Sequence, residues 1–224
     1  MNSSVDHPPI TRAFRWLAAG AMLALSFGPI RNTCSATTID SRTLSLPEGK
    51  WRQVGRPQDF EFKTWSRKLS ALVVIAHGNV CPVLRQNHQA FTRIRSRYQK
   101  EGVGFVMINS VRHDQLSAIE QEMREYKIAI PIIHDPEQKL LQQFGYHTVG
   151  QVLVFQRKES GWQLQYSGGI DDRVNFDRAL PQAQNKYLED TLDELLSKKP
   201  VGFKSSPIFG CAISIDKKQD ATNR

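Results

Sequence analysis

The stretch Ser70–Tyr98, SALVVIAHGNVCPVLRQNHQAFTRIRSRY, joins a predicted strand to a predicted helix through a turn that ends in a cysteine. Leu72–Ile75 is a short, β-branched apolar run, which is typical of a strand covered on both faces. Cys81 precedes Pro82, and proline is well tolerated only in the first turn of a helix. One face of that helix is predicted to carry Leu84, His88, Phe91, Ile94, Arg95 and Tyr98. The stretch therefore predicts Cys81 at or beside the N-cap of an amphipathic helix.

This position bears on the chemistry of Cys81. A helix N-terminus carries partial positive charge and unpaired N–H groups, which favour a thiolate over a thiol. The thiolate is the nucleophilic form of cysteine. A small buried cysteine that only fills a strand end is the alternative interpretation. Because strand, glycine-containing turn, Cys-Pro and helix follow one another directly, we interpret Cys81 as a nucleophile.

Composition and charge narrow the classes of function. The chain has 224 residues, of which 40% are hydrophobic and 23% charged, so it can bury one sizeable core. Its formal charge is +8, and the first 36 residues, with three arginines and one aspartate, leave +6 for the remainder. This charge forms no basic run, whereas binding to phosphate backbones needs clustered charge. We therefore expect no nucleic-acid partner.

The N-terminal 36 residues have the pattern of an export signal. Arg12 and Arg15 precede the apolar stretch Trp16–Ile30, which is too short and too interrupted to span a bilayer comfortably. Small residues at Cys34–Ala36 predict signal-peptidase cleavage after Ala36, and an uncleaved membrane anchor is the alternative. The protein is thus predicted to be exported, periplasmic or secreted, and to contact a membrane only if this segment is retained.

The cysteine count limits the available thiol chemistry. The chain has three cysteines, and cleavage after Ala36 would leave only Cys81 and Cys211. In an oxidising compartment two such thiols can form one bridge. The sequence leaves this pairing open, because a disulfide requires Cα atoms within about 7 Å of each other.

The remaining segments predict an α/β architecture. We expect short strands in residues 37–70, with Trp51, Phe60, Phe62 and Trp65 packing in the core rather than forming a ligand site. Predicted strands follow at Val103–Ser110, Ile130–Asp135, Gln151–Gln156 and Trp162–Gly169, and predicted helices at Leu116–Tyr126, Pro136–Gly145 and Gln182–Lys198. Asp135 is the expected N-cap of the second of these helices, with Pro136 in its first turn. Alternating strands and helices, then a hairpin and a helix, indicate helices packed on a mixed sheet.

This order of elements, with a cysteine at the first strand-to-helix turn, resembles the thioredoxin-like fold, and within it the redoxin family related to alkyl hydroperoxide reductase and thiol-specific antioxidant proteins. The matching motifs are Cys81-Pro82-Val83, Asp135-Pro136 before Phe144-Gly145, Gly169-Ile170-Asp171-Asp172-Arg173, and Gly210-Cys211 after Lys199-Pro200-Val201. The resemblance covers about residues 44–213. It implies a three-layer sandwich with a mixed central sheet flanked by helices.

The domain organisation follows from these features. Residues 1–36 form the signal peptide or N-terminal anchor, residues 37–203 the thioredoxin-like domain, and residues 204–224 a C-terminal tail that carries Cys211. The tail is rich in Pro, Gly and Ser but contains the apolar stretch Pro207–Ile213, so we expect it to fold back onto the domain.

Several residues are candidates for the site around Cys81. Cys211 is the candidate resolving cysteine. Arg85, four residues after Cys81 on the same helical face, is either a stabiliser of the thiolate or an oxyanion, or a solvated side chain. A polar loop follows the hairpin and comprises Asp171, Asp172 and Arg173. The resemblance implies that this loop lines the pocket of Cys81. The alternative is a turn with an internal ion pair.

The chain departs from its relatives at three positions. Leu84 stands where thioredoxins have the second cysteine of C-x-x-C, and Gly78 where peroxiredoxins have Thr or Ser. In the loop that faces the cysteine, Val149-Gly150 places a glycine where thioredoxin-like proteins usually have a cis proline.

We therefore predict an exported thiol-disulfide oxidoreductase of the redoxin family that acts through Cys81. A thiol peroxidase and a non-catalytic accessory or binding module of the same fold are the alternatives. The expected partners are a protein or small-molecule thiol, disulfide or peroxide, and an external thiol reductant. No cofactor is expected, and no metal, because His77 and Cys81 alone supply too few ligands and position 85 is arginine.

Overall fold

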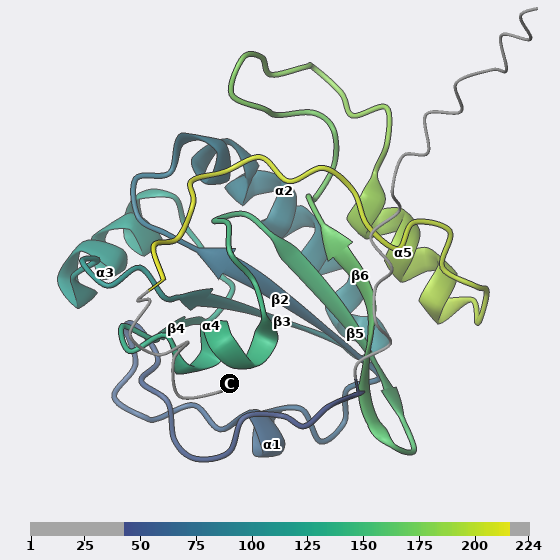
Figure 1. The fold of residues 1–224 in the computed structure, drawn as a ribbon, viewed down its shortest axis with the longest axis horizontal. Coiled ribbons are helices and arrows are strands. Elements are labelled where there is room, and N and C mark those ends of the chain that lie inside the picture. The colour runs from purple at the N-terminus through teal and green to yellow at the C-terminus, as the bar shows by residue number, and fades with distance from the viewer. Residues whose placement is uncertain (1–42, 216–224) are drawn as a thin grey trace, which may run out of the picture. The chain divides into compact units, whose positions relative to one another are not determined.

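The structure is a computed structural model and describes residues 43–215. Its centre is a six-stranded sheet in the order β1-β6-β5-β2-β3-β4 (Figure 1). The strands are β1 Thr43–Leu44, β2 Ala71–His77, β3 Val103–Asn109, β4 Ile132–His134, β5 Val152–Lys158 and β6 Gly161–Gly168. β2, β3 and β4 run parallel, whereas β5, β6 and β1 are antiparallel to their neighbours. The mixed sheet is confirmed.

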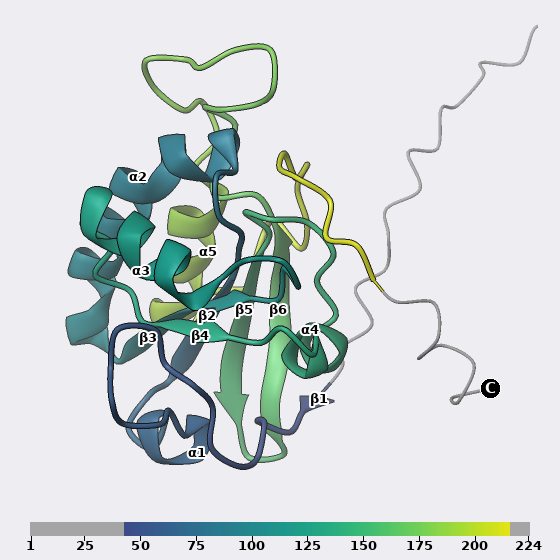
Figure 2. The ribbon, with the colours of Figure 1, turned by 90° about the vertical axis from the view of Figure 1, so that its left-hand side faces the viewer.

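Helices cover both faces of this sheet. The helices are α1 Phe62–Trp65, α2 Pro82–Tyr98, α3 Leu116–Glu125, α4 Lys139–Phe144 and α5 Tyr187–Leu196, with a 3-10 turn at Gln99–Glu101. Tyr98 of α2 donates a hydrogen bond to Asp193 of α5 at 2.7 Å, so these two helices share a face. On the other face the rings of Phe62 in α1 and Phe144 in α4 lie 5.7 Å apart. Figure 2 shows α4 opposite α2 and α3, so the three-layer arrangement is confirmed.

The strand-turn-helix unit around Cys81 agrees with the prediction. Every residue of β2 is buried, as a central strand between β5 and β3 requires. Cys81 is the N-cap of α2 and Pro82 occupies its first turn. The predicted apolar face of α2 is buried except for Arg95, which is half-buried.

Two helices begin later than predicted. α4 begins at Lys139 rather than at Pro136, because Gln138 adopts a left-handed conformation with φ +60. Asp135 still caps this helix from a distance, since its carboxylate accepts the backbone N–H groups of Lys139, Leu140 and Leu141 at 3.0 to 3.1 Å.

α5 begins at Tyr187 rather than at Gln182. Residues 173–186 form an extended loop there, in which the backbone N–H groups of Gln184 and Asn185 are taken by the Asp172 carboxylate. These bonds compete with a helical conformation.

The segment before β2 also differs from the prediction. It contains the short helix α1, and its extended parts form isolated bridges between Trp51 and Phe60 and between Gln53 and Ile133. The predicted signal segment and Cys34 lie outside the described residues. Within residues 43–215 no helix has the length and apolarity that a membrane crossing needs.

Asp135 provides a test of the fold. Replacement of Asp135 by alanine removes the acceptor of three N–H groups and of the Ser110 hydroxyl. We expect a loss of about 2 kcal/mol in the free energy of unfolding, measured by urea denaturation. Glu137→Ala, at an exposed position of the same turn, serves as control and should leave stability unchanged. Equal stability of both variants would contradict the capping role.

Candidate active site

Cys81 and Cys211 lie in direct contact although they are far apart in sequence. Their Sγ atoms are 3.3 Å apart, and Cys211 donates its S–H to Cys81. Both are free thiols. Cys81 is buried, with 2% of its surface exposed, whereas Cys211 is exposed. Because a disulfide has an S–S length of about 2.05 Å, a displacement of little more than 1 Å separates this pair from a bond.

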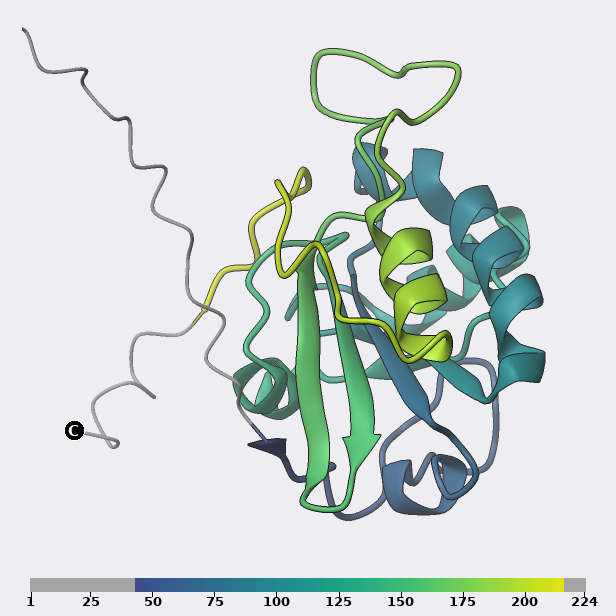
Figure 3. The ribbon, with the colours of Figure 1, turned by 90° about the vertical axis from the view of Figure 1, so that its right-hand side faces the viewer.

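The C-terminal tail carries Cys211 to this position along the end of β6 (Figure 3). The Ser167 N–H donates to the carbonyl of Lys204 at 3.0 Å, and the Gly169 N–H donates to the Ser206 hydroxyl at 2.9 Å. The Ser206 hydroxyl also lies 2.6 Å from the hydroxyl of buried Tyr166. Residues 204–214, which we call the strap, are thereby fixed to the sheet before they reach the cysteine.

The strap then pairs with the loop that faces Cys81. The Val149 N–H donates to the carbonyl of Cys211 and the Ile213 N–H to the carbonyl of His147, both at 2.9 Å. These bonds form an antiparallel bridge between Thr148 and Ala212. Gln138 holds the end of the strap by donating to the carbonyl of Ser214 at 2.8 Å. The fold-back expected for the tail is therefore present.

Glycines permit this close approach. A Cβ on Gly210 would lie 1.8 Å from the carbonyl oxygen of Val149, and a Cβ on Gly78 would lie 2.6 Å from the Val149 side chain. Gly150 has φ +87, a conformation that favours glycine. The departures from the family pattern at positions 78 and 150 thus belong to one packing arrangement around Val149.

The two thiols have different electrostatic settings. Partial burial, the hydrogen bond to Cys81 and the charge on Cys81 together raise the pKa of Cys211 to about 11. At neutral pH Cys211 is therefore a thiol that donates its proton toward Cys81. This geometry suits Cys81 as the attacking group and Cys211 as the group that reacts second.

The turn before Cys81 is held by two carboxylates that sequence reasoning missed. Asp114 accepts the N–H of Asn79 at 2.8 Å, and Glu122 accepts the N–H of Val80 at 3.1 Å. Val80 is β-branched yet has φ +56, a strained conformation that these bonds help to fix. Both carboxylates come from the segment after β3, so only the tertiary fold connects them with the turn.

Arg85 faces α3. Its Nε donates to Glu122 at 2.8 Å, and its guanidinium lies 5.3 Å from the centre of the Tyr126 ring. This pairing raises the pKa of Arg85 chiefly through the hydrogen bond to Glu122. Arg85 thus holds the carboxylate that supports the turn, and its action on the Cys81 thiolate stays a prediction.

The polar loop Asp171–Arg173 packs beside the second turn of α2. Arg173 donates to the carbonyl of Gln86 at 2.9 Å and to the side chain of Asn87 at 2.8 Å. Its Nε lies 4.0 Å from the Asp171 carboxylate. This contact matches the alternative interpretation of the loop, a turn with an internal ion pair. Burial raises the pKa of Asp171. These contacts brace α2, and a direct role of the loop at Cys81 stays a prediction.

Two buried histidines, His77 of β2 and His88 on the predicted face of α2, lie beside each other near the site. His77 accepts a hydrogen bond from Asn109 at 3.1 Å, and its ring stacks on that of His88 with centres 6.2 Å apart. Within the described residues, His77 Nε2 and both ring nitrogens of His88 have no hydrogen-bond partner. Burial lowers the pKa of His77 to about 3 and that of His88 to about 4. Both rings are therefore neutral at physiological pH.

Comparison with known proteins bears on the family and the fold of the chain. The model of the redoxin family matches residues 45–157. No curated protein matches the sequence significantly. An uncharacterized conserved protein from Geobacillus kaustophilus shares 20% identity with a TM-score of 0.68, over 79% of this chain and 92% of the other. A hypothetical protein from Sinorhizobium meliloti 1021 shares 20% identity with a TM-score of 0.63, over 79% and 99%.

Among more distant structures, peroxiredoxin Q from Xanthomonas campestris shares 13% identity with a TM-score of 0.44, over 69% of this chain and 94% of the other. These likenesses concern the fold. The predicted thioredoxin-like fold is confirmed, and no argument about activity rests on the peroxiredoxin match.

Because of the two buried histidines, we expect the protein to lose stability in acid. Their pKa values are lower in the folded chain than the unfolded value of about 6.5, so the unfolded state binds more protons below that pH. The free energy of unfolding should fall as pH drops from about 6.5 toward 4, by up to roughly 1.4 kcal/mol per pH unit for each histidine. His88→Phe should reduce the change of unfolding free energy with pH, as measured by urea denaturation at several pH values. Glu122 and Arg85 are the charged groups that face this position and are unchanged in the variant. The control, exposed His113→Gln, should not reduce this pH dependence, and an unchanged pH dependence in His88→Phe would refute the explanation.

The close contact of Gly210 with Val149 allows a test of whether strap docking positions Cys211 beside Cys81. In Gly210→Ala the added methyl group cannot fit against Val149, so the strap must shift away from the loop. We expect oxidation by diamide to form the Cys81–Cys211 bridge at least tenfold more slowly, as followed by mass spectrometry of alkylated samples. Gly202→Ala, before the strap, is the control and should keep the wild-type rate. Bridge formation at the wild-type rate in Gly210→Ala would show that strap docking does not position Cys211.

Proposed function

Because the chain belongs to the redoxin family, we propose that it is a thiol-disulfide oxidoreductase in which Cys81 attacks the substrate and Cys211 resolves the intermediate. The observation that carries this proposal is the 3.3 Å separation of the two Sγ atoms. No cysteine follows Cys81 at the spacing of C-x-x-C, and the strap supplies the second thiol from the other end of the domain.

The reaction then has two exchange steps. The Cys81 thiolate attacks one sulfur of a substrate disulfide, forms a mixed disulfide and releases the other half of the substrate as a thiolate. Cys211 passes its proton to that leaving thiolate and attacks the Cys81 sulfur, which releases the second half as a thiol after protonation from solvent. The chain ends as a Cys81–Cys211 disulfide and the substrate as two thiols. An external dithiol reductant reverses the change in the chain.

Access to Cys81 supports a second candidate function. The thiol is 2% exposed beneath the strap, which leaves more room for a small oxidant than for a protein disulfide. A peroxide ROOH would transfer its terminal OH to the Cys81 thiolate to give a sulfenic acid, and the RO⁻ released would take a proton from solvent to leave as ROH. Cys211 would then displace water from the sulfenic acid to give the same disulfide. Both reactions use the same pair of thiols and differ in the oxidant.

We also propose that the protein acts after export, as the pattern of its N-terminal 36 residues predicts. In the periplasm or outside the cell, the oxidising environment favours the disulfide form of such a pair, and the external reductant becomes the partner that the enzyme requires.

Serine variants can distinguish the roles of the two thiols. They are made in a Cys34→Ser background, which removes the third cysteine. Reduction of a substrate disulfide, with a dithiol present to return the chain to its reduced form, should be abolished in Cys81→Ser. Cys211→Ser should accumulate the mixed disulfide at Cys81, seen as an adduct in intact-mass spectra, and turn over at least tenfold more slowly. Hydrogen peroxide in place of the disulfide distinguishes the second candidate. Wild-type rates with both oxidants in Cys81→Ser would refute the proposal. A wild-type protein that turns over neither oxidant above background would favour a non-catalytic module.

A further inference from the structure

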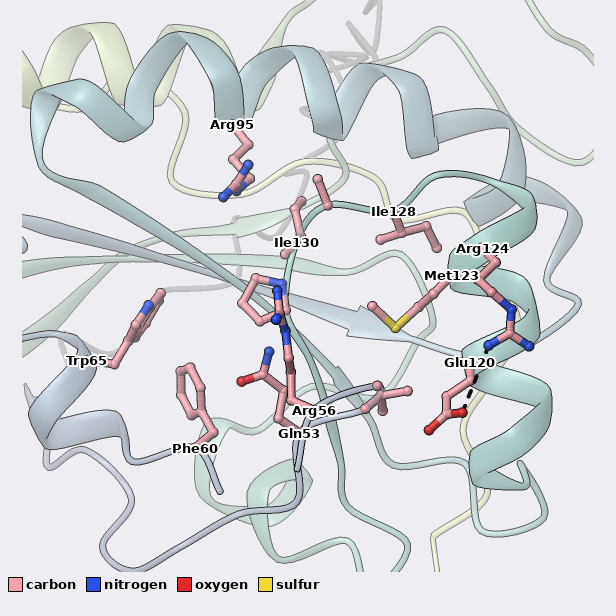
Figure 4. A pocket seen from close by; sticks show the side chains of 14 residues that line it. Gln53, Arg56, Phe60, Trp65, Arg95, Glu120, Met123, Arg124, Ile128 and Ile130 are labelled. Carbon is pink, nitrogen blue, oxygen red and sulfur yellow. Dashed lines mark ion pairs between the residues drawn. The ribbon is translucent and has the colours of Figure 1, made fainter. Parts of the chain in front are cut away.

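A cavity of about 800 Å³ lies away from both cysteines, at the β4 edge of the sheet. Its walls come from the segment before α1, from α1, from the last turns of α2, from α3 and from the connection to β4 (Figure 4). This volume is within the range of cavities that hold small-molecule ligands. Neither Cys81 nor Cys211 lines it, so the cavity has no part in the proposed thiol chemistry.

Apolar side chains make up about half of the floor and walls of the cavity. They include Phe60, Trp65, Met123, Ile128 and Ile130. The rings of Phe60 and Trp65 are in contact, with centres 5.0 Å apart. Two of the four aromatic residues assigned to the core in the sequence analysis therefore face this space.

Trp65 packs directly on β3. A Cβ on Gly104 of β3 would lie 2.8 Å from the Trp65 ring, so the absence of a side chain there lets the indole lie against the strand. The cavity is thus preformed on this side, which lowers the entropic cost of binding an apolar group.

The charged residues of the cavity are mostly cationic. Three arginines and one glutamate line it. Arg124 pairs with Glu120 at 4.0 Å on the far side. Arg95 of α2 points into the space from above, and Arg56 stands at its centre (Figure 4). In the part of the chain that the structure describes, neither Arg56 nor Arg95 has an acidic partner within ion-pair distance.

From this combination we propose that the cavity binds a small amphipathic carboxylate, with its apolar chain against Trp65 and Met123 and its carboxylate between Arg56 and Arg95. Guanidinium groups are suited to carboxylates, which they bind through paired hydrogen bonds. Burial of a hydrocarbon chain against the apolar side chains would stabilise the complex. A hydrophilic anion such as a free phosphate would leave these side chains exposed to water.

The test uses the full chain labelled with ¹³C at the methionine methyl groups, and decanoate as the probe. Met123 lines the cavity, whereas Met107 is fully buried in β3 and reports on the fold. Titration with decanoate should shift the Met123 signal with saturation and leave the Met107 signal in place. Decanol, which lacks the charge, and acetate, which lacks the chain, should each bind at least tenfold more weakly.

Charge-removing variants complete the test. Arg56→Gln and Arg95→Gln should each weaken decanoate binding about tenfold, because each removes a charge-assisted contact. Arg52→Gln removes the same charge from an exposed position of the same segment outside the cavity, and should bind like the wild type. If Arg95→Gln alters the Met107 signal, that variant has disturbed the fold, and the test then depends on Arg56→Gln, which lies in an exposed loop. Absence of saturation, equal affinity for decanol or acetate, or unchanged affinity in Arg56→Gln would overturn the proposal.

Discussion

The arrangement of the candidate active site depends on a short antiparallel pairing between the strap and the loop His147–Val149. Two backbone hydrogen bonds of 2.9 Å fix the register in which Cys211 reaches Cys81. Because side chains alternate along an extended segment, a shift of one residue would turn the Cys211 side chain away. The glycines at 78 and 210 are required on either side of Val149 for the segments to come this close. A resolving thiol can therefore come from the C-terminus, without a second cysteine in α2.

The two sites that we propose lie toward opposite ends of one helix. Cys81 occupies the N-cap position of α2, and Arg95 lies in its last turns, which places them roughly 20 Å apart at 1.5 Å per residue. Between them α2 is braced by Glu122 through Arg85, by Arg173 through Asn87, and by Glu189 through Arg93. These contacts hold the helix in place between the proposed thiol chemistry at one end and the cavity at the other.

The sequence was sufficient for those features that depend on local patterns. β2, the N-cap position of Cys81 and the end of α4 at Gly145 follow from β-branched runs, from Cys-Pro and from glycine, and all are confirmed. The start of α5 was predicted wrongly, because Asp172 takes backbone N–H groups from a segment that lies later in the chain. The carboxylates behind the Cys81 turn and the buried histidine pair depend on contacts between distant segments, for which no local pattern exists. The same holds for the strap, whose fold-back was expected from its apolar residues but whose register was not.

The central claim is that Cys81 and Cys211 act as one redox pair. Equilibration of the Cys34→Ser protein with glutathione buffers of graded potential, followed by acid quenching, alkylation and peptide mapping, tests it most directly. We expect a single two-electron transition between the dithiol and one Cys81–Cys211 disulfide, with little glutathione bound to either cysteine. Independent glutathionylation of the two cysteines, without a peptide that links them, would contradict it.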